Sequence, residues 1–199
     1  MLWSTHIDQG VDILRADPQS APTAALTHFC SAGYPPLGMP PPSPRLDKAK
    51  RFICAFHNHT LSNGTTHWTM SWIDIRNSYA VHFDSLWDDQ GTNAIAESLQ
   101  SARRDRESKA RKTMLDWLAG TWADIRAVPP AKFWHYLTGS KTMQQDGWSC
   151  GLQMLETLRV ILESGGTGDV LDELRAEHHR LSPAAVQAWK TRFEQSKKA

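Results

Sequence analysis

At 199 residues, the chain is long enough for one domain with a complete hydrophobic core and too short for two ordinary domains. Its 22 basic residues balance 21 acidic ones, so the net charge of +1 provides no overall field for nucleic acid or a membrane surface. Three cysteines without CxxC spacing favour free thiols in a reducing compartment over a disulfide scaffold. The sequence has no stretch of roughly 20 apolar residues and no secretory signal at its start, so we expect an intracellular protein.

The first half of the chain predicts helices followed by strands. Residues 5–15 place apolar side chains at helical spacing, and a second short helix is predicted from Pro22 to near Gly33. The proline-rich stretch within 34–50 predicts a surface loop, because proline excludes a helix interior or a central strand. Strands are predicted over 51–56, 67–76 and 79–85, with a loop at 59–66 and a tight turn at Asn77-Ser78. Three neighbouring strands in sequence favour an antiparallel sheet.

The second half predicts mainly helices, with one short strand at 133–137. Residues 93–127 form a predicted helical, basic insertion, in which 101–112 has six basic and two acidic residues and is expected to be a solvated surface. Further helices are predicted over 150–163, 168–179 and 183–195. The first of these has an apolar face of Gly151, Met154, Leu155, Leu158, Ile161 and Leu162. We therefore expect residues 1–199 to form one α+β domain.

The segment 143–151 carries the strongest chemical signal. It delivers Cys150 to the first turn of a predicted helix, where the helix dipole and unpaired backbone N–H groups favour a thiolate over a thiol. Gln144 and Gln145 lie just upstream, and a side-chain amide N–H from either could stabilise a developing oxyanion. Cys30 and Cys54 lack this setting and are expected to be small buried apolar residues.

A nucleophilic thiol needs a base and a group that orients the base. His67 begins one predicted strand and Asp84 ends the next, so a hairpin would bring the two together. Asp88 and Asp89 are neighbouring alternatives to Asp84. The pair His57 and His59 lacks further ligands for a metal, and we expect it to be solvated at a strand end.

The segments 64–86 and 144–151 resemble the Ulp1-type SUMO proteases, which are papain-like cysteine proteases. The matching features are His67-Trp68, then Asp84-Ser85-Leu86 after the family's usual interval, then Gln144 six residues before Cys150-Gly151. The resemblance implies a helical part packed on a small, mainly antiparallel sheet, with the active site at their junction. It also implies that Cys150 is the nucleophile, His67 the base, Asp84 its orienting group and Gln144 the oxyanion donor. The 66 residues from Asp84 to Cys150 exceed the family's usual span.

The resemblance further implies a ubiquitin-like protein as partner, with SUMO expected first and ubiquitin or a NEDD8-like protein next. Cleavage would follow the C-terminal Gly-Gly, and Trp68, Trp148 and Trp3 are the candidate substrate-binding residues. The family's N-terminal tryptophan is displaced here, because Trp3 lies two places after its expected position. We expect a monomer in the nucleus or cytoplasm that requires no cofactor or metal and binds no nucleic acid or membrane.

Two other functions use the same residues. A catalytically silent chain would serve as a binding module for a ubiquitin-like protein, and an acyltransferase would pass the acyl group from Cys150 to an amine. The protease hypothesis requires that the sulfur meet the imidazole of His67 and that an incoming chain can reach the sulfur.

Overall fold

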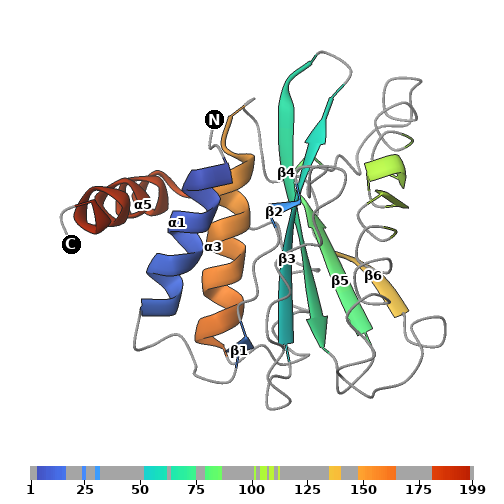
Figure 1. Cartoon of the computed structure of the whole chain (residues 1–199), viewed down its shortest axis with the longest axis horizontal. Coiled ribbons are helices and arrows are strands. Elements are labelled where there is room, and N and C mark those ends of the chain that lie inside the picture. Colours follow the sequence, from blue (N-terminus) through green and yellow to red (C-terminus); the bar gives the residue numbers. More distant parts are fainter. Residues whose placement is uncertain are drawn as a thin grey trace, which may run out of the picture.

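A computed structural model of the chain describes residues 4–16, 24–25, 30–31, 52–61, 64–74, 79–86, 135–139, 148–164 and 181–197, with single positions between 101 and 112. Within these residues the helices are α1 (Ser4–Ala16), α3 (Cys150–Glu163) and α5 (Pro183–Ser196). The strands are β1 (Ala24–Ala25), β2 (Cys30–Ser31), β3 (Phe52–Thr60), β4 (Thr66–Asp74), β5 (Tyr79–Asp84) and β6 (His135–Gly139). Figure 1 shows α1 and α3 side by side along one face of the sheet, with α5 farther out.

The sheet is built around three antiparallel strands, β3, β4 and β5. Its order is β1-β3-β4-β5-β6, with β2 also paired to β3, and the outer strands β1, β2 and β6 run parallel to their neighbours. The register sets His59 opposite His67 and Thr69 opposite Asp84. An α+β fold with a mainly antiparallel sheet is therefore confirmed.

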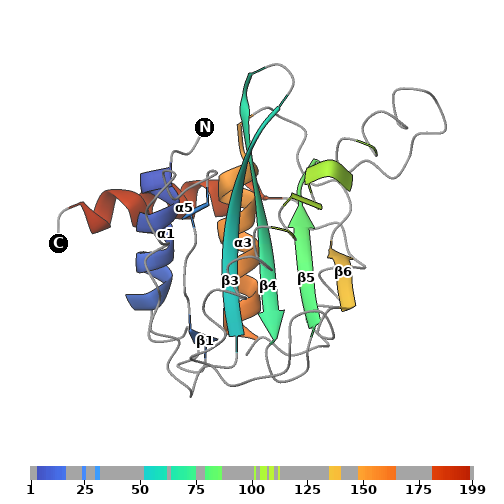
Figure 2. The same cartoon turned by 45° about the vertical axis from the view of Figure 1, so that its right-hand side comes forward.

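Alternation along β4 divides its side chains between two environments. Trp68, Met70 and Trp72 are 0% exposed and belong to the same apolar core as the buried face of α3. Each buried side chain of this kind contributes on the order of 1.5–3 kcal/mol to stability. His67, Thr69 and Ser71 lie on the opposite face and are also buried. Figure 2 shows the second face of the sheet, where the described pieces of 101–112 lie near the end of β5.

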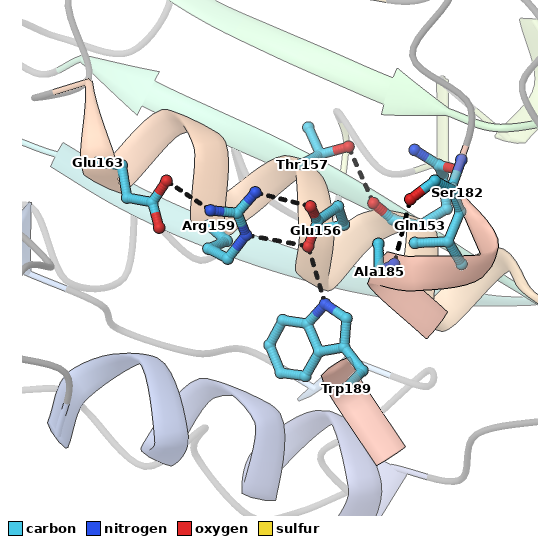
Figure 3. Close-up of polar contacts among 9 residues, drawn as sticks. Gln153, Glu156, Thr157, Arg159, Glu163, Ser182, Ala185 and Trp189 are labelled. Atoms are coloured by element: carbon cyan, nitrogen blue, oxygen red, sulfur yellow. Dashed lines mark hydrogen bonds and ion pairs between the residues drawn. The ribbon is translucent and has the colours of Figure 1, made fainter. Parts of the chain in front are cut away.

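Close helix packing fixes the position of α3. Gly10 allows α1 to approach α3, because a Cβ at this position would lie 2.5 Å from Cδ1 of Leu155. Trp189 of α5 is also buried and donates its indole N–H to Glu156 of α3 at 2.9 Å. Figure 3 shows that Arg159 joins this contact by binding both Glu156 and Glu163.

The start of α5 is held by two further hydrogen bonds. The Ser182 side chain caps the helix by accepting from the backbone N–H of Ala185 at 3.1 Å (Figure 3). The backbone N–H of Leu181 donates to Oε1 of the buried Gln153 at 3.0 Å. Neighbouring helices therefore hold α3, which begins at Cys150, in place over its length.

Most predicted elements are confirmed. The helices predicted at 5–15, 150–163 and 183–195, and all four strands, differ from the observed elements by a few residues at their ends. The six residues predicted to face inward from α3 are all buried.

Two of the predicted elements were wrong. The helix predicted from 22 to 33 gives way at 24–25 and 30–31 to strands β1 and β2, since short helices are marginal and the edge of β3 offers backbone partners. The loop predicted at 59–66 begins later, because β3 stays paired with β4 as far as Thr60. The loop at 34–50, the turn at 77–78, the helix at 168–179 and most of the 93–127 insertion lie outside the described residues.

Candidate active site

Three elements bring together the side chains of Cys150, His67 and Asp84. Cys150 is the first residue of α3, His67 the second residue of β4, and Asp84 the last residue of β5. Because Asp84 pairs with Thr69, two residues after His67, the carboxylate lies diagonally across the ladder from the imidazole on the same face. Nε2 of His67 lies 2.7 Å from Oδ1 of Asp84.

The other side of the His67 ring meets the thiol. The side chains of His67 and Cys150 are joined by a hydrogen bond, and Nδ1 is the ring nitrogen available for it, since Nε2 binds Asp84. The backbone N–H groups of Trp68 and Gly151 also donate to the Cys150 sulfur. Cys150 carries a free thiol. The order carboxylate, imidazole, thiol is the arrangement that prepares a cysteine for nucleophilic attack.

The electrostatics favour a thiolate beside an imidazolium. Burial raises the pKa of the Cys150 thiol, but the hydrogen bond from His67, its charge and the two backbone N–H groups outweigh burial and lower the pKa below its ordinary value. Burial alone would lower the pKa of His67, yet its hydrogen bonds to Asp84 and Cys150 outweigh burial and raise it. The pKa of the thiol falls and the pKa of the imidazole rises because each charge stabilises the other.

Asp84 is held from several sides at 1% exposure. Burial raises the pKa of its carboxyl, but the hydrogen bond and charge of His67, with the charge of Arg106, hold that pKa far below its usual range. Oδ1 also accepts the backbone N–H of Leu86 at 2.9 Å. Oδ2 accepts from Nε of Arg106 at 2.9 Å and lies 2.8 Å from its Nη2.

The contact with Arg106 was missed in the sequence, where 101–112 was predicted to be a solvated surface. Arg106 is instead 11% exposed and bound to Asp84. No local signal marks this residue, because it lies among five other basic side chains of the same stretch.

The candidate substrate-binding residues differ in their exposure. Trp148, two residues before Cys150, is 45% exposed. Trp68 is 0% exposed and lies in the core, so the part of it that meets the site is its backbone N–H. Cys150 itself is only 1% exposed, so an incoming chain must displace covering groups to reach the sulfur. Gln144, Gln145, Trp3, Asp88 and Asp89 lie outside the described residues.

His57 and His59 are not solvated, contrary to the prediction. They are 3% and 9% exposed because β3 extends beyond them and places them on the same face as His67. His57 Nε2 lies 3.1 Å from Oγ of Ser71, and His59 Nε2 lies 2.9 Å from Oγ1 of Thr69.

The described residues lack what a metal site and a membrane-spanning helix require. They contain no group of three or more His, Cys, Asp or Glu side chains arranged to hold a metal ion. They also contain no helix with the length and apolar character that a membrane crossing requires.

A helix that begins at a cysteine and packs on a sheet bearing a histidine and an aspartate is the papain-like protease architecture. Among solved structures, the chain superposes on the Ulp1 protease domain in complex with SMT3, the yeast ortholog of SUMO, with a TM-score of 0.55 and 16% identity over 98% of this chain and 76% of that one. Ulp1 with its catalytic cysteine oxidised to a sulfenic acid gives a TM-score of 0.54 and 15% identity over the same shares. The chain therefore has an Ulp1-like cysteine protease fold.

A Chlamydia trachomatis protein, ChlaDub1, aligns with a TM-score of 0.41 and 17% identity over 95% of this chain and 76% of that one. No family model matches the sequence, and no curated protein matches it. The fold assignment rests on the two Ulp1 superpositions.

Proposed function

We propose that this protein is a cysteine protease that cleaves the peptide or isopeptide bond after the C-terminal Gly-Gly of a ubiquitin-like protein. The observation that carries the proposal is the continuous chain of hydrogen bonds from Asp84 through His67 to Cys150. A buried structural cysteine needs neither an imidazole nor two backbone N–H groups directed at its sulfur.

In the proposed reaction, the Cys150 thiolate attacks the carbonyl carbon of the terminal glycine. The negative charge passes to the carbonyl oxygen, which the backbone N–H of Cys150 and the side chain of Gln144 would stabilise. The tetrahedral intermediate collapses to a thioester as the imidazolium of His67 gives its proton to the leaving amine. His67 then removes a proton from water, which attacks the thioester and restores the thiolate-imidazolium pair. Asp84 holds the ring orientation through both steps.

The choice of substrate draws support from the surroundings of the sulfur. At 1% exposure, Cys150 leaves little room for an incoming chain, which suits glycine because a side chain would add a Cβ to the passing chain. The exposed indole of Trp148, two residues before Cys150, is a suitable platform for the extended tail. One solved structure of the same fold is a protease complex with the yeast SUMO ortholog, which makes SUMO the first partner to test.

The test is a panel of activity probes made from SUMO, ubiquitin and a NEDD8-like protein, each with a C-terminal vinyl sulfone. The wild-type chain should form a covalent adduct with at least one probe, and Cys150→Ser should abolish the adduct. Cys54→Ala is the matched control, since it removes a buried thiol that is remote from His67 in the sheet and should leave labelling intact. Failure of every probe to label a folded wild-type chain would contradict the protease proposal.

The low exposure of Cys150 also favours one alternative, a silent binding module for a ubiquitin-like protein. The same panel separates the two functions. A module would bind an unmodified ubiquitin-like protein in a titration and form no adduct, whereas a protease would do both.

A further inference from the structure

The stretch 101–112 contains one side chain that does not behave like its neighbours. Of the seven residues that the structure describes there, six are exposed, including Arg104, Asp105 and Lys109. Arg106 is 11% exposed and directs its guanidinium to the buried end of β5. A largely covered arginine among exposed described neighbours needs a reason, because a charged side chain is rarely removed from water unless it is paired.

The reason is that the two carboxylate oxygens of Asp84 bind different partners. Oδ1 receives the imidazole of His67 and the backbone N–H of Leu86. Oδ2 receives Nε and Nη2 of Arg106 at 2.9 and 2.8 Å. The planar guanidinium thus fixes the carboxylate from the side opposite His67, and the rotation of the carboxylate that would release the imidazole also breaks both contacts with arginine.

We infer that Arg106 is a positioning residue for catalysis, which acts through Asp84 to orient the His67 ring and to set the proton affinity of that ring. The inference rests on the proposed protease function. It connects the basic segment 101–112 to the active site, so this segment contributes to the chemistry as well as to the surface.

The charge of Arg106 also has a direct electrostatic effect. A carboxylate shared between two cations stabilises each of them less than it would stabilise one alone. Arg106 therefore limits how strongly Asp84 favours the imidazolium of His67, while it keeps Asp84 ionised whether or not His67 carries a proton. Removing the cation should make His67 bind its proton more tightly and leave the carboxylate less firmly oriented.

Several other groups influence the same pair and must be constant in any comparison. The ionisable groups that interact with His67, Asp84 or their neighbours are Cys150 on α3, His59 on β3, His82 on β5 and Lys109 in the basic segment. Arg106 contacts Oδ2 of Asp84 through Nε and Nη2, so substitution of Arg106 removes both of these contacts.

The test compares Arg106→Gln and Arg106→Lys with the control Arg104→Gln, which removes an exposed charge of the same segment. The readout is the pH profile for inactivation of Cys150 by iodoacetate, followed by mass spectrometry of the Cys150 peptide. Iodoacetate is an anion, so its rate rises as the thiolate forms and falls as the imidazolium loses its proton. The pH profile is therefore bell-shaped. Its lower and upper limbs report the two apparent pKa values of the thiol-imidazole pair.

In Arg106→Gln, the upper limb should move to higher pH by about 0.5–1 unit, and kcat on the best Gly-Gly substrate should fall about tenfold or more. Arg106→Lys keeps the cation and loses the two-point contact, so its upper limb should stay within about 0.2 units of wild type while kcat still falls. Arg104→Gln should match wild type in both measurements.

Two results would overturn the inference. One is a pair of folded Arg106 variants with wild-type limbs and wild-type kcat. The other is a loss of thermal stability with both limbs unmoved, which would make Arg106 merely structural. If Arg106→Gln does not fold, Arg106→Lys is the remaining test of the inference. A wild-type kcat in Arg106→Lys would contradict the inference. Because iodoacetate requires no protein substrate, a shifted profile without cleavage of any ubiquitin-like protein would count against the proposed function and not against this inference.

Discussion

Nε2 of His67 and Oδ1 of Asp84 lie 2.7 Å apart, and each side chain is only 1% exposed. A contact this buried has one geometric consequence: the ring is held with Nδ1 on the side of Cys150. The contact depends on the β4-β5 register, since a slip of one residue would place Asp84 on the opposite face of the sheet.

Replacement of Asp84 with Asn should lower kcat more than it changes KM. An asparagine of the same shape can present its amide N–H to His67, which favours the wrong ring tautomer and removes the charge that stabilises the imidazolium. We expect a loss of on the order of 10²- to 10⁴-fold in kcat, measured with the Gly-Gly substrate that labels best. Asp105→Asn, an exposed aspartate next to Arg106, is the control and should retain activity. Full activity in Asp84→Asn would remove this residue from the mechanism.

The thiolate of Cys150 should form below the pH range of an ordinary thiol and should depend on His67. The pKa of Cys150 is lowered because the interactions with His67 and two backbone N–H groups outweigh burial. In His67→Gln, burial of the Cys150 thiol is opposed by fewer hydrogen-bond donors, so the pKa of this thiol should rise. The rate of its alkylation by iodoacetamide at pH 7 should then fall at least about tenfold. His6→Gln on α1 serves as the control. Equal rates in wild type and His67→Gln would show that no ion pair exists.

The part of the site that one hairpin and one helix end position could be predicted from the sequence. The 17-residue interval from His67 to Asp84 contains two strands and one turn, and the apolar face of 150–163 fixes where a helix begins. Arg106 could not be found in this way. Its contact depends on how a distant basic segment crosses the end of β5, and its residue type does not differ from that of its neighbours.

Two other features depended on pairing across the sheet. The two-residue strands β1 and β2 form because β3 offers them backbone partners, and no periodicity is visible in so short a run. The burial of His57 and His59 follows from a register that aligns His59 with His67. Once that register is known, alternation places these histidines on the same buried face.

The packing of α5 on α3 should depend on the polar contact of Trp189 as well as on its burial. Trp189→Phe keeps an aromatic ring in the core and removes the N–H that binds Glu156 at 2.9 Å. We expect a loss of about 1–3 kcal/mol in the free energy of unfolding, measured by urea denaturation. Trp148→Phe changes an exposed indole and should alter stability by less than about 0.5 kcal/mol. Equal effects of the two substitutions would contradict the role of this contact.

The buried histidines of β3 should make the fold sensitive to mild acid. Burial lowers the pKa of His59 to about 4 and that of His57 well below its ordinary value, so the unfolded chain binds protons that the folded chain does not. Stability should therefore be constant with respect to these groups above pH 6.5 and fall as the pH drops from 6.5 towards 4. His59 alone would account for up to about 3 kcal/mol. His67 opposes this trend, because its raised pKa favours the folded chain at low pH.

Unfolding free energies at pH 7, 6 and 5 should show the decline in stability, and His59→Gln should make this decline shallower. Asn58→Gln, a half-buried neighbour that does not titrate, should leave the slope unchanged, and a wild-type slope in His59→Gln would refute the assignment.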